Sequence, residues 1–434
     1  MIETVSETVT NRRPFGFWTA AALVVGGMIG SGIFTLPAQL ASYGWTSVAA
    51  WIAAIAGALV ISRVLVRLAE LFPLEPGVVA ICARELGPFL GALVGWSYWV
   101  SVWAANAYIA ITAIRYLGMF WPPLTATPGA LVIASVVLIW LITLLNLRGA
   151  KTAGRFQVVT TILKLMPLVA VVVLIAGFAL AGGGQFTASP HAPFAWGGIT
   201  AAIPPVFFAL VGFETASVAA ERVRDPAKNV RRATYAGLTM TGLLYIVICT
   251  GIIMAMPQAT IAAAQAPIAL FVETFWGHWA GLAMAGFTAI AAIGALNGWV
   301  LIQGEVPLGM ARAGMLPAWF GRTDKRDVPV GVLLVSSLCA SVLILSNIST
   351  SAAIFYDFML RLTAAANLWL YIGACFAALK RRTAIPAALV GAAFSLWAIW
   401  GSGWQAAGLS IALMLTAIPL YLLRPKAGAA PVVA

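Results

Sequence analysis

Two ionisable residues lie inside segments of the chain that are otherwise apolar. Lys164 is in residues 161–167, Thr-Ile-Leu-Lys-Leu-Met-Pro, and Glu214 is in residues 207–217, Phe-Phe-Ala-Leu-Val-Gly-Phe-Glu-Thr-Ala-Ser. An ionisable side chain at membrane depth is costly to keep, so it indicates binding or ion movement by default. For Glu214 the structural alternative is a buried acid that is protonated or hydrogen-bonded.

A glycine-rich stretch offers backbone groups that could bind a carboxylate. Residues 26–34 read Gly-Gly-Met-Ile-Gly-Ser-Gly-Ile-Phe, and each glycine weakens a helix by roughly 1 kcal/mol relative to alanine. Unwound backbone is tolerated in a membrane where it is buried or lines a cavity. The freed amides of Ser31 and Gly32 would face that cavity at the positive end of the following half-helix, which attracts anions. Close packing of helices through small residues is the alternative.

The segment around Glu214 predicts a second interruption with the opposite chemistry. A helix broken beside Gly212 would expose backbone carbonyls, which suit an ammonium group. Interrupted helices at corresponding positions in the two halves of a chain are typical of inverted repeats with a binding site near the middle of the membrane. The two stretches together predict a site for a zwitterion or an organic cation.

The composition requires that these helices lie in a membrane. Of the 434 residues, 62% are hydrophobic and 9% are charged, whereas a soluble domain carries about 25% charged residues. The net charge of +12 does not indicate nucleic acid, because the basic residues lie in short loops between apolar runs. The four cysteines are far apart and there are two histidines, so we expect no metal site, no cofactor and no disulfide framework.

The apolar runs predict an all-α membrane protein with 12 transmembrane helices, because about 20 mostly apolar residues cross a bilayer. The predicted spans are 16–40, 45–65, 88–120, 129–147, 156–182, 197–219, 233–255, 277–303, 329–346, 352–377, 385–401 and 404–423.

The basic residues of the loops support this count. If the N-terminus is cytoplasmic, they all fall on the cytoplasmic side, from Arg12 and Arg13 to Arg424 and Lys426, and the opposite loops contain none. This distribution follows the positive-inside rule. It predicts a multi-pass protein of the cell inner (plasma) membrane with both termini cytoplasmic.

Arg115, Lys164 and Arg361 fall inside predicted spans. Arg115 is near the outer end of its span and could extend to the membrane surface. Arg361 follows Asp357 by four residues, the spacing of an ion pair on a helix. Lys164 has no such structural explanation and stays a functional candidate.

Three motifs in order along the chain resemble the amino acid–polyamine–organocation transporter family. Residues 27–34, Gly-Met-Ile-Gly-Ser-Gly-Ile-Phe, with Leu-Pro-Ala at 36–38, are similar to the signature of its first span. Residues 212–218 with Pro-Ala-Lys-Asn-Val at 226–230 resemble its sixth span and the following loop, and residues 312–317 resemble the loop after its eighth span. Within the family the chain resembles the bacterial arginine/agmatine antiporters.

The resemblance implies a LeuT-type fold, in which spans 1–5 and 6–10 form inverted repeats and spans 1 and 6 are broken. The expected parts are a cytoplasmic segment (1–15), the two repeats (16–182 and 183–382), a hairpin of two C-terminal helices (383–423) and a cytoplasmic tail (424–434). A homodimer is a further implication.

The resemblance also implies roles for matching residues. Ser31 and Gly32, with the backbone around Met28 and Ile29, would bind the substrate carboxylate, and the carbonyls near Phe208 and Val211 would bind its α-ammonium. The other implied residues are Trp299, which stacks on the distal cation; Asn106, which contacts the distal end; Ser101, Val102 and Thr363 of the side-chain pocket; and Tyr98, Phe208, Glu214 and Tyr371 of the gates.

The sequence departs from the arginine/agmatine antiporters at several of these positions. Phe208 replaces a gating tryptophan, Gly27 replaces an asparagine, and Ser101, Val102 and Thr363 change the pocket. Lys164 resembles the lysine that other members hold near the place of a sodium ion. That likeness implies sodium-independent transport, by exchange or by proton coupling through Lys164.

The predicted function is therefore the exchange of a cationic, arginine-like amino acid for its agmatine-like amine product by alternating access. Proton-coupled uptake of neutral or more varied amino acids is the alternative within transport. A membrane-embedded enzyme would need a catalytic cluster, which the sequence does not indicate, and a receptor or channel without transport is the remaining class. The expected partners are a small amino acid or amine and the lipid bilayer, without nucleic acid.

Overall fold

The computed structural model describes residues 16–73, 75, 77–148, 164–186, 192–214, 223, 225–346 and 352–425. Within them the regular elements are α-helices and short 3-10 turns. The helices of the first half are α2 (Phe17–Met28), α3 (Gly32–Leu40), α4 (Thr46–Leu71), α5 (Val78–Leu86), α6 (Pro88–Leu117), α7 (Pro128–Asn146) and α9 (Leu165–Leu180).

The second half continues the same architecture. Its helices are α10 (Trp196–Leu210), α12 (Pro226–Ala255), α13 (Gln258–Ala263), α14 (Pro267–Trp276), α15 (His278–Arg312), α16 (Val330–Leu345), α17 (Ala352–Lys380), α18 (Ile385–Gly401), α19 (Trp404–Leu415) and α20 (Ala417–Leu422). The 3-10 turns are η1 (Ala41–Tyr43), η2 (Pro122–Leu124), η3 (Gly184–Phe186) and η5 (Ala318–Gly321).

Seven helical stretches of the described chain are long and apolar enough to cross a membrane, and the bent pair α2–α3 would make eight. Shorter apolar helices, including α9, α10, α16 and α18, pack against these long helices. Large apolar side chains on α7, α9 and α16 are more than half exposed, including Leu141, Val169 and Leu338. Such surfaces require lipid rather than water as the neighbour, so the protein is a multi-span membrane protein.

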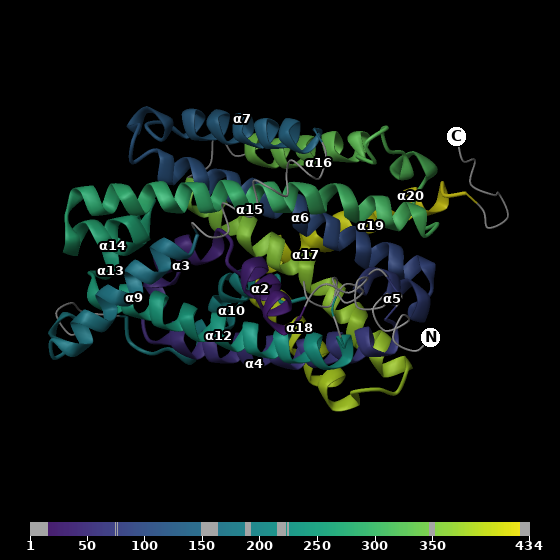
Figure 1. Cartoon of the computed structure of the whole chain (residues 1–434), viewed down its shortest axis with the longest axis horizontal. Coiled ribbons are helices and arrows are strands. Elements are labelled where there is room, and N and C mark those ends of the chain that lie inside the picture. The colour runs from purple at the N-terminus through teal and green to yellow at the C-terminus, as the bar shows by residue number, and fades with distance from the viewer. Residues whose placement is uncertain are drawn as a thin grey trace, which may run out of the picture.

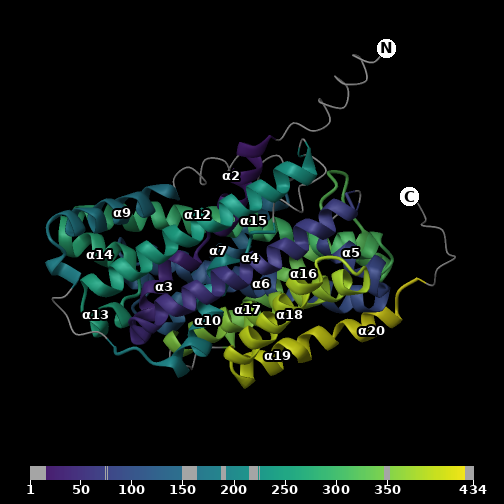
Figure 2. The same ribbon diagram turned by 90° about the horizontal axis from the view of Figure 1, so that it is seen from below.

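Two helices form the centre of the bundle. In the most apolar stretch of α6, 89% of the residues are buried, and in the corresponding stretch of α17 the share is 83%. Both run through the middle of the molecule, where α6 packs against α15 and against α17, while α7 and α16 lie together along one edge (Figure 1). The C-terminal helices α19 and α20 form another edge (Figure 2), and their stretch is only 17% buried. The side chains of α6 and α17 are therefore positioned to line an interior site.

Polar contacts join the loops at one end of the bundle. The Arg67 Nε donates to Thr383 Oγ1 at 3.1 Å, and the Arg381 Nε lies 2.8 Å from Glu85 Oε2, which links the helices α4 and α5 to the α17–α18 loop. The helices α13 and α14 lie at the opposite end (Figure 2), and residues 256–276 contain no lysine or arginine. The two ends thus differ in charge, as expected of membrane orientation.

Several helices extend beyond the predicted spans. The helix α4 continues to Leu71, α12 begins at Pro226, and α15 continues to Arg312, because a helix can leave the hydrocarbon layer with polar residues on its last turns. Three short helices, α5, α13 and α14, occupy segments that were predicted as loops. Parts of the predicted spans 156–182 and 197–219 lie outside the described residues.

Two basic residues inside the spans have clear partners. The Arg361 Nε donates to Asp357 Oδ2 at 2.6 Å, so the predicted ion pair is confirmed, and Nη1 donates to the carbonyls of Ala201 and Gly401 at 2.9 and 3.1 Å. The guanidinium of Arg115 lies over the ring of Tyr356, 4.1 Å from its centroid. Arg361 thus ties α17 to α10 and α18.

Candidate functional site

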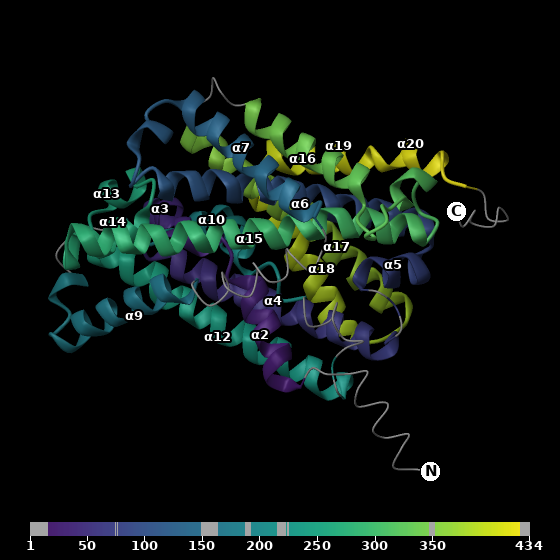
Figure 3. The same ribbon diagram turned by 45° about the horizontal axis from the view of Figure 1, so that its top comes forward.

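The glycine-rich stretch interrupts a helix, as its composition predicts. The helix α2 ends at Met28, Ile29 leaves the helical conformation at ψ 85°, and α3 begins at Gly32. The axes of the two segments differ by 46°. The α2 segment lies beside α12 and points out of the bundle (Figure 3). The break leaves the last carbonyls of α2 and the first amides of α3 without helical partners.

A second break follows α10. Leu210 is its last helical residue, Val211 has ψ 138°, and Gly212 has φ +111°, a conformation that glycine adopts without strain. A Cβ at Gly212 would lie 2.6 Å from the carbonyl carbon and oxygen of Gly27. The two breaks therefore meet backbone against backbone, and only glycine fits at the contact.

A cavity of about 30 Å³ lies at this meeting point. It is lined by Gly27, Met28, Gly30, Ser31, Gly32, Ser101, Ala105, Ile109, Phe208, Ala209, Val211, Trp299, Thr363 and Asn367. Every one of them is buried or half-buried. The volume suits roughly one or two water molecules, so the walls must separate before an amino acid can occupy the cavity.

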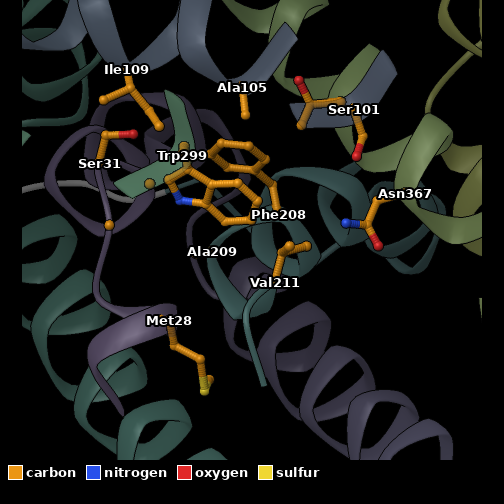
Figure 4. A pocket seen from close by; sticks show the side chains of 14 residues that line it. Met28, Ser31, Ser101, Ala105, Ile109, Phe208, Ala209, Val211, Trp299 and Asn367 are labelled. Carbon is orange, nitrogen blue, oxygen red and sulfur yellow. The ribbon is translucent and has the colours of Figure 1, made fainter. Parts of the chain in front are cut away.

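The aromatic rings of Trp299 and Phe208 lie together at the centre of the pocket (Figure 4). Ser31 is on one side of them, and Asn367 and Ser101 are on the other. None of the lining residues is acidic. A cation in this cavity would therefore be stabilised by aromatic faces and by backbone or amide oxygens rather than by a carboxylate.

Most of the residues implied by the resemblance come together at this cavity. Those that line it are Met28, Ser31, Gly32, Ser101, Phe208, Val211, Trp299 and Thr363. Ile29 and Val102 are buried without lining it. Asn106 is also outside the lining, and its Nδ2 donates to Gln303 Oε1 at 2.7 Å. Its contact with substrate stays a prediction.

The sequence reasoning missed Asn367, which lines the cavity from α17. Asn367 follows Thr363 by four residues, so the two lie on the same face of the helix. That spacing was the available signal. Ala105, Ile109 and Ala209 were also missed, since small or aliphatic residues in a membrane helix carry no signal of their own.

The predicted inner-gate residues come from three places in the fold. Tyr371 lies on α17 one turn after Asn367, Glu214 follows the break after α10, and Tyr98 lies on α6. Glu214 Oε2 accepts hydrogen bonds of 3.0 Å from Gly212 N and from the hydroxyl of Tyr371. The rings of Tyr371 and Phe213 stack with centroids 5.3 Å apart. Tyr98 is half-buried, and its carbonyl accepts a 2.6 Å hydrogen bond from Ser101 Oγ.

A column of aromatic rings continues from the cavity on the side of Phe208. The ring of Tyr108 meets Phe208 edge to face at 4.9 Å and stacks on Tyr356 at 4.2 Å. The hydroxyl of Tyr108 is hydrogen-bonded to Thr35 and accepts from Gln39 Nε2 at 3.1 Å. These contacts join α3, α6, α10 and α17 beyond the cavity.

The freed carbonyls at the end of α2 have buried donors. Lys164 is 4% exposed, and its Nζ donates to the carbonyl of Gly26. The hydroxyl of Tyr245 donates to the carbonyl of Met28 at 2.9 Å. Lys164 thus supports the broken helix directly and does not line the cavity.

Metal chemistry has no support within the described residues. No group of three or more His, Cys, Asp or Glu side chains there could hold a metal ion. The arrangement can hold a small polar solute between two broken helices, with amides on one side and aromatic faces beside it.

Known antiporters are similar to this chain over most of its length. The chain is 31% identical over 352 residues to the cadaverine/lysine antiporter of Escherichia coli (strain K12), covering 79% of this chain and 77% of that protein. It is 30% identical over 393 residues to a putative arginine/ornithine antiporter of Bacillus subtilis (strain 168), covering 82% of this chain and 81% of that protein.

A third relative is the arginine/ornithine antiporter of Pseudomonas aeruginosa, 30% identical over 343 residues, covering 76% of this chain and 70% of that protein. These relatives are transporters and not enzymes, in agreement with the class predicted from the sequence. The sequence model for amino acid permeases matches residues 15–429. The chain therefore belongs to the amino acid permease family.

Proposed function

We propose that this protein is a sodium-independent antiporter that exchanges a cationic amino acid for a second organic cation by alternating access. The relatives are named for lysine with cadaverine and for arginine with ornithine, so the counter-substrate is either a diamine or another basic amino acid. The arginine and agmatine pair predicted from the sequence is one member of this class.

In this proposal the backbone binds the part that all amino acids share. The amides of Ser31 and Gly32, beside the backbone of Met28 and Ile29, bind the carboxylate at the start of α3, where the helix dipole is positive. The carbonyls near Phe208 and Val211 accept from the α-ammonium. The indole of Trp299 then faces the cationic side chain.

The observation that carries the proposal is the contact between the two helix breaks beside the cavity. Gly212 fits against Gly27 with no room for a Cβ, and Ser31, Phe208 and Trp299 surround the space beside them. The same cavity therefore offers a site for a carboxylate and an aromatic surface for a cation. A channel or receptor needs no such paired interruption.

The proposed transport cycle uses a gate on each side of the cavity. Tyr98, Glu214 and Tyr371 form the inner gate, and Phe208 separates the cavity from the rings beyond it. The proposed topology has 12 spans with both termini cytoplasmic. Residues 16–182 and 183–382 form the inverted repeats, residues 383–423 form a C-terminal hairpin, and two copies of the chain form a homodimer.

The test is counterflow with purified protein in proteoliposomes. Vesicles loaded with lysine, ornithine, arginine, cadaverine or agmatine should accumulate labelled lysine or arginine, while vesicles loaded with alanine or with buffer should not. Replacement of sodium by potassium should not change the rate. Equal uptake into buffer-loaded vesicles would contradict exchange.

Proton-coupled uptake is the second candidate, and the contact between Lys164 and the Gly26 carbonyl favours it. Loss of a proton from this lysine would weaken its hold on the end of α2, which borders the cavity. An imposed pH gradient, acidic outside, should then drive labelled amino acid into vesicles that contain no counter-substrate. The antiport proposal predicts no such uptake.

A further inference from the structure

Asn367 contributes a polar side chain to the cavity that the proposed contacts do not use. It lies on α17, is 1% exposed and lines the cavity. Its Oδ1 atom is buried and has no hydrogen-bond partner among the described residues. Burying an acceptor without a partner costs free energy, so an unpaired oxygen at a cavity indicates that a ligand group binds it.

Asn106 and Asn146 also have a buried Oδ1 without a partner among the described residues, but their amide nitrogens bind neighbouring helices. Asn106 Nδ2 donates to Gln303 Oε1 at 2.7 Å. Asn146 Nδ2 donates to Asn297 Oδ1 at 3.1 Å, which links α7 to α15. Within the described residues Asn367 forms no such link between helices, and unlike Asn106 and Asn146 it lines the cavity. A structural link between helices therefore does not account for it.

The position of Asn367 suits the far end of a substrate. Figure 4 places Ser31 and Asn367 on opposite sides of the Trp299 and Phe208 rings. A solute whose carboxylate is bound at Ser31 would extend along the indole of Trp299 and end near Asn367. Ser101 lies on the same side as Asn367, and its hydroxyl donates to Tyr98 O, which leaves the oxygen free to accept.

We infer that the Asn367 carboxamide binds the distal amine of the cationic substrate and selects it over a neutral amino acid of the same length. This rests on the proposed function. In Figure 4 the amide nitrogen points toward the cavity, and a half-turn about the Cβ–Cγ bond brings Oδ1 to the same place as an acceptor. The oxygen then accepts from an ammonium whose charge the indole face also stabilises.

The test compares two ligands that differ in the distal amine. Binding of lysine and of norleucine, which has the same carbon chain without that amine, is measured by calorimetry on purified Asn367→Leu and wild-type protein. Lysine affinity should fall about 10- to 100-fold, the range for a lost hydrogen bond to a charged group, while norleucine affinity stays the same. Asn367→Asp keeps the acceptor and should retain lysine binding.

Thermal stability separates this role from a structural one. Asn367→Leu loses no hydrogen bond, so the ligand-free protein should melt at the wild-type temperature or above it. Asn146→Leu is the matched control and should melt lower, because it breaks the link to Asn297. Equal losses for lysine and norleucine would overturn the inference, and so would unchanged lysine affinity. Wild-type protein that binds none of lysine, ornithine and arginine would overturn the proposed function itself.

Discussion

The hydroxyl of Tyr371 donates a 3.0 Å hydrogen bond to Glu214, and the same carboxyl oxygen accepts from the amide of Gly212 at 3.0 Å. One acid thus connects α17 to the break that follows α10. The contact lies one helical turn from Asn367, on the cavity-lining face of α17. If the cavity opens on the side of Glu214, the hydrogen bond between Tyr371 and Glu214 must either break or move together with both residues.

The first prediction concerns this bond. Tyr371→Phe keeps the ring stacked on Phe213 but removes the donor, and it should lower the free energy of unfolding by about 1 kcal/mol. Thermal or denaturant unfolding in detergent measures the change. Tyr421→Phe, on the peripheral helix α20, is the control and should have no effect. Equal stability of the Tyr371 variant and the wild type would remove the proposed gate contact.

The second prediction concerns the contact between the two breaks. Gly212→Ala places a Cβ against Gly27 and forces a side chain into φ +111°, so exchange should fall at least 10-fold, with lower thermal stability. Gly309→Ala is the control, because its Cβ meets nothing within 4 Å in a helix. It should leave stability unchanged or raise it by about 0.5–1 kcal/mol. A fully active Gly212→Ala protein would show that the breaks do not meet as described.

The third prediction concerns the cation surface. Trp299→Leu removes the aromatic face, which is worth about 0.5–2 kcal/mol to a cation and therefore up to roughly 30-fold in affinity. Competition in the counterflow assay should show weaker inhibition by lysine or arginine and little change for alanine. Trp299→Phe should recover part of the loss. Equal weakening of charged and neutral solutes would count against stacking on a cation.

The fourth prediction separates the two transport modes at Lys164. Lys164→Met leaves the Gly26 carbonyl without its donor, which should cost about 1–3 kcal/mol of stability. Under antiport, the exchange rate should keep its dependence on pH while its magnitude falls. A flattened pH profile would favour proton-coupled uptake instead. Lys228→Met, at an exposed position of α12, controls for the loss of one positive charge.

The sequence predicts the parts of the site that depend on backbone chemistry. Glycines at 26, 27, 30 and 32 predict the break between α2 and α3, and Gly212 beside Glu214 predicts the turn after α10. These signals are local, because an uninterrupted helix disfavours such residues. The paired interruptions also predict one shared binding site, but how closely the two breaks meet is visible only in three dimensions.

Other features depend on neighbours that the sequence does not show. Asn106 has the residue type of a ligand-binding group, yet Gln303, nearly two hundred positions away, takes its amide. Asn367 has the same type, and its Oδ1 has no partner within the part of the chain that the structure describes. The short helices α13 and α14 are not predicted by a search for about 20 consecutive apolar residues, because neither is long enough to cross a membrane.

The tightness of the cavity has a thermodynamic consequence. A space of about 30 Å³ means that the conformer described here cannot hold an amino acid, so a solute binds by drawing population into a wider one. The measured dissociation constant is then the intrinsic one divided by the fraction of that conformer. Substitutions that widen the cavity should tighten apparent binding even where they remove no contact and add none.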